Sequence, residues 1–103
     1  KIKVMKYLDK VKASKEVIEA ITSLPKDGEL KVIFGKDRSG QPKEFKIRAY
    51  EAYGNKMSYS IWSGIGGMNI DKIGRTTMKG YTYDMMSQKT TYVFPLYDIK
   101  VIK

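Results

Sequence analysis

The chain has no cysteine and no histidine among its 103 residues. Without cysteine it forms no disulfide and has no thiol nucleophile, so its stability must come from packing. Without histidine it lacks the side chain that most often acts as a general acid or base near neutral pH. Zinc sites are built mainly from the same two residue types. These absences predict a protein that is not an enzyme and that uses no metal and no other cofactor.

Long apolar runs are also missing, because no segment approaches the ~18 residues that a membrane-spanning helix needs. The first ten residues, KIKVMKYLDK, carry lysines but no apolar core after them, so we expect no signal peptide. A cytoplasmic protein without a membrane partner is therefore expected. The length, together with 42% hydrophobic and 30% charged residues, predicts a single folded domain over residues 1–103.

Negative charge is scarce, with 11 Asp/Glu against 20 Lys/Arg and a net charge of +9. Residues 1–52 carry 13 basic and 8 acidic side chains, and residues 53–103 carry 7 and 3, so the surplus is spread along the chain. This spread places the charge on the folded surface rather than on a tail. A basic domain of this kind favours nucleic acid as the partner. The alternative is that the lysines serve only solubility.

Apolar periodicity predicts a helix in the first third of the chain. Apolar residues recur at a helical spacing from Val17 to Leu24, with Ser14 as the expected N-cap and Pro25 after the helix end. Residues 2–4 alternate between apolar residues and lysine, so we expect a short strand there and a helical turn over residues 5–12. The alternative is a helix over this segment, because Val4, Leu8 and Val11 also fit one helix face.

From residue 29 onward the apolar period is two, which is typical of strands with one wet face. Strands are expected near residues 29–34, 44–50, 57–62, 81–86, 91–94 and 97–101, whereas residues 68–75 show no clear period. The predicted fold class is α+β: an N-terminal helix packed on an antiparallel sheet of about five to seven strands.

One side of the predicted sheet combines basic and aromatic residues. Trp62 has the same parity as the serines of its strand, and basic residues alternate along the preceding strand. Single-stranded nucleic acid is often held by cations that follow the phosphates and by aromatic rings that stack on bases. The alternative is that these aromatic residues pack inside the protein. The predicted nucleic-acid-binding residues are Lys43, Lys46, Arg48 and Tyr50 on one side of a strand, Trp62 on the next strand, and Lys56 and Arg75 as further phosphate contacts.

The segment from Gly64 to Gly67 contains three glycines, whose backbone amides could approach an anion. It lacks a dinucleotide-binding fingerprint, because Asn69 stands where the last glycine would be. The alternative is a flexible bend between two strands.

The leading interpretation is a non-enzymatic nucleic-acid-binding protein. Two alternatives remain: an accessory or inhibitor protein that docks on an acidic partner surface, and a sponge for a small anionic ligand. In composition, this short chain rich in lysine and tyrosine is similar to many small proteins of phages and mobile elements. The strand-rich second half also leaves room for a homodimer through an open sheet edge.

Overall fold

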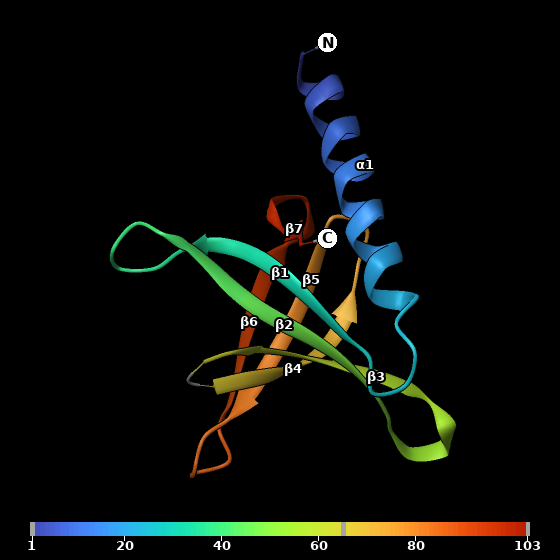
Figure 1. Ribbon diagram of the computed structural model, residues 1–103, viewed down its shortest axis with the longest axis vertical. Coiled ribbons are helices and arrows are strands. Elements are labelled where there is room, and N and C mark those ends of the chain that lie inside the picture. Colours follow the sequence, from blue (N-terminus) through green and yellow to red (C-terminus); the bar gives the residue numbers. More distant parts are fainter. Residues whose placement is uncertain (1, 65, 103) are drawn as a thin grey trace.

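The computed structural model describes residues 2–64 and 66–102 (Figure 1). Over these residues, one helix, α1 (Ile2–Thr22), precedes a seven-stranded antiparallel sheet, which confirms the predicted α+β class. The strands are β1 (Glu29–Lys36), β2 (Pro42–Glu51), β3 (Met57–Ser63), β4 (Gly66–Ile73), β5 (Thr77–Tyr83), β6 (Lys89–Pro95) and β7 (Lys100–Val101).

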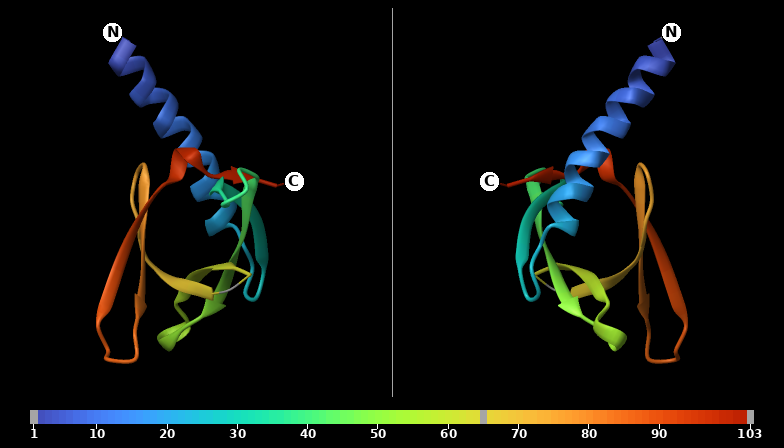
Figure 2. Two further views of the ribbon diagram at one scale, coloured as in Figure 1. Left: turned by 90° about the vertical axis from the view of Figure 1, so that its left-hand side faces the viewer. Right: turned by 90° about the vertical axis from the view of Figure 1, so that its right-hand side faces the viewer.

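The strands lie in the order β6-β5-β4-β3-β2-β1-β7, so the first six form consecutive hairpins and the last returns to pair with the first. The sheet curls into a half-barrel, and α1 crosses one end of it (Figure 2). Two short 3₁₀ helices, η1 (Tyr53–Asn55) and η2 (Leu96–Asp98), complete the described elements. The curl gives the sheet a concave face on the core side and a convex face on the outside.

Two hairpin loops, residues 37–41 and 84–88, are closed by the same type of side-chain hydrogen bonds. In the loop between β1 and β2, Asp37 Oδ1 accepts hydrogen bonds from the amides two and four residues further on, at 2.9 and 3.0 Å. Asp84 does the same between β5 and β6, at 2.8 and 2.9 Å. Side chains of this type favour turns because they satisfy backbone donors locally. The Ser39 hydroxyl, and after it the Gln41 amide, hold the pKa of Asp37 below its ordinary value.

The core lies between the concave face and the second half of α1. Every other residue of the central strands points inward, and the helix adds one apolar stripe, as its spacing predicted. The buried cluster consists of Val17, Ile21, Val32, Ile47, Ile61, Met78, Phe94, Leu96 and Ile99. The described part of the chain holds no helix with the length and apolarity that crossing a lipid bilayer requires.

The predicted start of the helix is wrong. The expected strand at residues 2–4 is part of α1, and Ser14 is not an N-cap but a buried residue in mid-helix. Its hydroxyl donates to the Lys10 carbonyl oxygen at 2.7 Å. The first half of α1 extends beyond the sheet (Figure 1), where no neighbouring strand offers backbone partners. Only a helix satisfies the backbone from within the segment itself.

Strand β4 was not expected, because its alternation is interrupted. Its pairing with β5 shifts register between Ile70 and Lys72, as a β-bulge does. Met68 and Ile70 pack against the core before the bulge, and Ile73 does so after it, at an odd spacing. Because of this extra residue, β4 lacks the continuous period-two pattern by which a strand is predicted from a sequence.

Two other strand boundaries differ from the prediction. Met85 was expected to continue a strand, but β5 ends at Tyr83 and Met85 lies fully exposed in the following loop. In the expected strand at residues 97–101, only Lys100–Val101 is a strand, because the chain first turns through η2. Pro95 ends β6, as expected of a residue that lacks an amide donor.

Candidate nucleic-acid interface

The convex face carries most of the charged side chains of the sheet. Three carboxylates lie among its basic residues: Glu29 and Glu44 on the first two strands, and Asp71 at the bulge of β4. The basic residues alternate with core residues along their strands and are all exposed. They include Lys31, Lys46, Arg48, Lys72, Lys79, Lys89 and Lys100.

Four of these lysines face each other in pairs. Lys31 and Lys46 are direct cross-strand partners on β1 and β2, and Lys72 and Lys79 are partners on β4 and β5. Like charges directly opposite each other destabilise a sheet. None of the four takes part in an ion pair among the residues that the structure describes. The convex face therefore keeps two repulsive pairs that an anionic partner would relieve.

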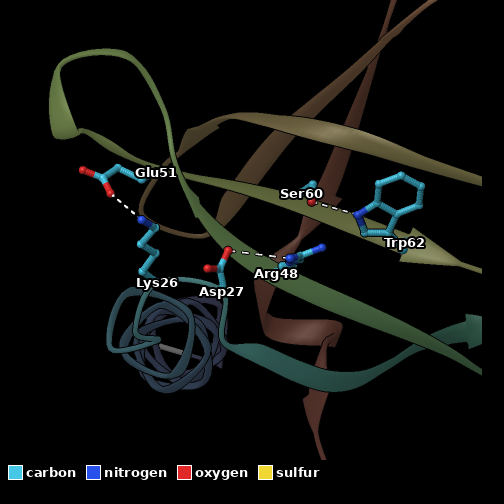
Figure 3. A network of polar contacts seen from close by, with 6 residues as sticks. All are labelled: Lys26, Asp27, Arg48, Glu51, Ser60 and Trp62. Atoms are coloured by element: carbon cyan, nitrogen blue, oxygen red, sulfur yellow. Dashed lines mark hydrogen bonds and ion pairs between the residues drawn. The ribbon is translucent and has the colours of Figure 1, made fainter.

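The ion pairs that do form in the described chain lie where α1 leads into β1 (Figure 3). Lys26 Nζ lies 3.1 Å from Glu51 Oε2, and Arg48 Nη2 lies 3.6 Å from Asp27 Oδ1. Both pairs are partly exposed, so each contributes about 1 kcal/mol or less. Arg48 is thus the one basic residue of the convex face whose charge is already shared with a carboxylate in the described structure.

Trp62 lies flat on the convex face beside Lys46. Its indole Nε1–H donates to Ser60 Oγ at 2.8 Å (Figure 3). A Cβ atom on the cross-strand partner Gly67 would lie 2.5 Å from two fused-ring atoms, Cδ2 and Cε3, so the ring covers the glycine backbone. The side chain is nevertheless 50% exposed. One face of the indole therefore rests on the sheet, while the ring remains accessible as an aromatic platform.

A hollow of about 220 Å³ separates Trp62 from the tyrosines of β5. Tyr81 and Tyr83 pack edge-on, with ring centroids 5.7 Å apart. Lys89 Nζ lies 4.7 Å from the centre of the Tyr81 ring. The hollow thus has an aromatic wall on each side and a cation next to one of them.

Four of the predicted site residues come together on this face: Lys46, Arg48, Tyr50 and Trp62. Tyr50 is less available than the others, because it is half-buried and its hydroxyl donates to Asn69 Oδ1 at 3.3 Å. The common placement of these four residues follows from strand alternation and from the register of β2 against β3.

The prediction that Lys43 shares this side is wrong. Its Nζ lies 5.3 Å from the centre of the Phe45 ring, and its side chain lines a pocket on the concave face. Strand β2 begins at Pro42, so regular alternation already includes Lys43 and places it with Phe45 and Ile47. The sequence prediction placed Lys43 in the turn before the strand, where a side chain need not follow the alternation of the sheet.

Lys56 and Arg75 are exposed but lie apart from the platform. Lys56 follows η1 in the turn before β3, six residues from Trp62 and thus about 20 Å along the strand. Arg75 lies in the turn between β4 and β5, next to Thr76, whose carbonyl oxygen accepts a hydrogen bond from the amide of Leu96 in η2. The structure therefore does not bring these two residues to the aromatic platform.

Several residues of the convex face were not predicted as site residues. Tyr81 and Tyr83 share one parity in the sequence, which was the available signal. Their proximity to Trp62 depends on β4 lying between the two strands, and that strand was missed. The other residues in this group are Lys31, Gly67, Lys72, Lys79 and Lys89.

The glycine segment forms the connection between β3 and β4. Gly64 and Gly66 flank residue 65, which lies outside the described residues. Strand β4 follows, rather than the helix whose N-terminus would favour a phosphate. The residues that the structure describes contain no group of three or more acidic side chains placed to hold a metal ion.

Comparison of the chain with protein-family models, with curated proteins and with solved structures finds no match.

Proposed function

We propose that the convex face binds single-stranded nucleic acid and that the protein is a non-enzymatic binder. The observation that carries this proposal is the flat, accessible Trp62 ring next to the repulsive pair Lys31 and Lys46. An aromatic face and unshared positive charge are the two features that a nucleic-acid strand satisfies together.

In this proposal the lysines bind the phosphates of the strand, and the Trp62 ring binds a base. Phosphates near the two lysine pairs would replace repulsion by attraction and would release counterions from the strand. A base would stack on the open side of Trp62, and the hollow toward Tyr81 has room for part of a neighbouring base or sugar. Stacking accepts every base, so we expect little sequence preference.

The primary test is a titration with a fluorescently labelled oligothymidylate at several salt concentrations. The logarithm of affinity should fall linearly with the logarithm of salt concentration, by about 0.7 for each phosphate neutralised on a single strand. Trp62 is the only tryptophan, so base stacking should also quench the intrinsic fluorescence. Absence of binding at about 50 mM salt would end this proposal.

Trp62→Ala should weaken oligonucleotide binding by about 1–3 kcal/mol, the contribution of one stacked base. Tyr53→Ala is the matched control, because Tyr53 is fully exposed on η1 and lies in the turn at the far end of β3. Both variants should melt at nearly the same temperature as the original protein. Equal affinity of the two variants would contradict the role of the platform.

An acidic protein partner would give another result on the same face. In that case polyglutamate would bind as tightly as the oligonucleotide, and neither would quench Trp62. Such an outcome would replace nucleic acid by an acidic protein surface as the partner.

A cytoplasmic location is part of the proposal, since single-stranded RNA is abundant there.

A homodimer through β6 also belongs to this proposal. In the described sheet β6 pairs on one side only, and residues 89–93 are exposed, whereas the opposite edge strand has only two residues. Antiparallel pairing with a second copy, centred on Tyr92, would place Lys89 opposite Pro95, so that no lysines meet. Sedimentation should show association that Val93→Lys weakens, because edge charges oppose pairing. A monomer at every concentration would rule the dimer out.

A further inference from the structure

The concave face contains a pocket of about 350 Å³, which shares only Gly67 and Met68 with the hollow beside Trp62. Its walls come from β2 and β6, which are not neighbours in the sheet, so the pocket lies inside the curl. Helix α1 contributes none of the described lining residues, because it packs on η2 and β7 at one end of the half-barrel (Figure 2). The lining residues are Lys43, Phe45, Ile61, Ser63, Gly66, Gly67, Met68, Tyr92 and Phe94.

The floor of this concave pocket is apolar and fixed by packing. Ile61 and Phe94 are buried, and the Phe34 ring packs edge-on against Phe94 with a centroid distance of 5.6 Å. Phe34 also lies 6.4 Å from Phe45, so three phenylalanine rings support one another. A preformed apolar floor suits the apolar body of a small ligand.

Small side chains leave the space open. Ser63 and Gly66 are cross-strand partners on this side of β3 and β4, and a Cβ atom on Gly66 would meet nothing within 4 Å. Further along, Gly80 is buried, and a Cβ there would come within 2.8 Å of the Met68 sulfur. Met68 therefore lies over Gly80. The pocket results from residue choice at these positions, and larger side chains would fill it.

Lys43 supplies a single positive charge at this apolar surface. It is half-buried, its Nζ lies over the Phe45 ring, and it is the only charged residue among those described as lining the pocket. It takes part in no ion pair among the described residues. A half-buried ammonium without a carboxylate partner favours an anionic ligand group, because burial strengthens the attraction between opposite charges.

We propose that the concave pocket binds a small amphipathic anion, with its carboxylate or similar head group on Lys43 and its apolar body on Phe45, Ile61 and Phe94. The volume is at the lower end of ligand sites, which favours a medium-length acyl chain or a small ring system. The charged and aromatic side chains of this site differ from those of the convex face. Lys43 and Lys46 lie on opposite sides of the same strand, so substitutions separate the two activities.

The test uses the fluorescent anion 8-anilinonaphthalene-1-sulfonate as the probe, with decanoate and decanol as competitors of equal chain length. Decanoate should displace the probe at lower concentration than decanol, because only decanoate offers a charge to Lys43. Lys43→Gln should weaken decanoate binding about tenfold, as expected for one charge-assisted hydrogen bond, and leave decanol unchanged. Lys46→Gln is the matched control and should leave both competitors unchanged.

Ser63→Leu should fill the pocket and reduce binding of both competitors, with thermal melting as the check on folding. If this variant does not fold, the comparison of Lys43→Gln with Lys46→Gln decides alone. Equal competition by decanoate and decanol, or unchanged decanoate binding in Lys43→Gln, would overturn the proposal. Ligand binding that weakens as protein concentration rises would also overturn it, because a second copy would then occupy the pocket. Oligonucleotide binding, measured in parallel, reports on the convex face alone.

Discussion

The two faces of the sheet are built from alternate residues of the same strands, yet they differ in burial, in polarity and in charge. On β2, Ile47 is fully buried on the concave face, whereas its neighbours Lys46 and Arg48 are exposed on the convex face. The concave side gathers aliphatic and phenylalanine side chains, and the convex side gathers lysine, tyrosine and tryptophan. The residues that stabilise the fold and the residues of the proposed binding surface therefore lie one position apart, so single substitutions should separate stability from the proposed binding.

The largest effect is expected from a pair of neighbours on β2. Ile47→Ala should lower the free energy of unfolding by about 2–5 kcal/mol, because it leaves a cavity in the core. Lys46→Ala should change it by no more than about 0.5 kcal/mol, because the side chain is exposed. Urea denaturation measures both. Similar losses in the two variants would contradict the separation of the faces.

Regular alternation explains why most of the sheet was predictable from the sequence. On β2 and β3 the apolar residues occupy every second position without interruption, so strand and face both followed from the pattern. At β4, one bulge residue, Asp71, moves the later residues to the opposite parity, and the strand was missed. Among the described side chains of α1, none from residues 6–12 belongs to the core or packs against it, so no buried stripe marked this part of the helix in the sequence.

A second prediction concerns the glycines under and beside Trp62. Gly67→Ala should push the indole off the backbone, because the new Cβ would lie 2.5 Å from ring atoms. We expect the oligonucleotide affinity to fall by about 1–3 kcal/mol, nearly as much as in Trp62→Ala. Gly66→Ala is the matched control, because a Cβ there meets nothing within 4 Å.

The readout of this second prediction is twofold. Tryptophan emission should shift to longer wavelength in Gly67→Ala as the ring loses its contact with the sheet, and should remain unchanged in Gly66→Ala. If Gly67→Ala binds the oligonucleotide as tightly as the original protein, a flat indole is not needed for binding.

A third prediction uses the repulsion between Lys31 and Lys46. Lys46→Glu should raise the free energy of unfolding by about 0.2–1 kcal/mol, because it turns a like-charge cross-strand pair into an attractive one. The same change should weaken oligonucleotide binding. The double variant Lys31→Glu/Lys46→Glu should lose the gain, since repulsion returns with the opposite sign. Additive effects of the two substitutions would show that the lysines do not interact.

The smallest effect is expected outside both faces, at the loop between β1 and β2. The folded state lowers the pKa of Asp37, chiefly through the Ser39 hydroxyl, so the ionised carboxylate stabilises the loop above the unfolded pKa of about 3.8. This stabilisation is lost as pH falls through the folded pKa. Asp37→Ala should therefore melt slightly below the original protein near neutral pH, and the difference should disappear in acid. A difference that persists at low pH would assign the loop's stability to other contacts.

The candidate site was less predictable than the fold because it depends on which strands are neighbours. Parity alone placed Lys46, Arg48, Tyr50 and Trp62 on one side. It could not show that Gly67 lies under the indole or that Tyr81 lies across a hollow from it, since both facts depend on register. Lys43 was misplaced because the start of β2 was predicted two residues too late, at residue 44 instead of Pro42.

The contact between α1 and the segment after β6 has a consequence for the order of folding during synthesis. Val17 and Ile21 pack with Leu96 and Ile99, and β7 pairs with β1, so the earliest elements of the domain depend on its latest ones. The hairpins from β1 to β6 connect neighbours in sequence and can form as they leave the ribosome. Because α1 packs on η2 and β7, we expect the helix to dock only after residues 96–101 have emerged. The C-terminal segment, residues 96–101, therefore completes the surface on which α1 packs.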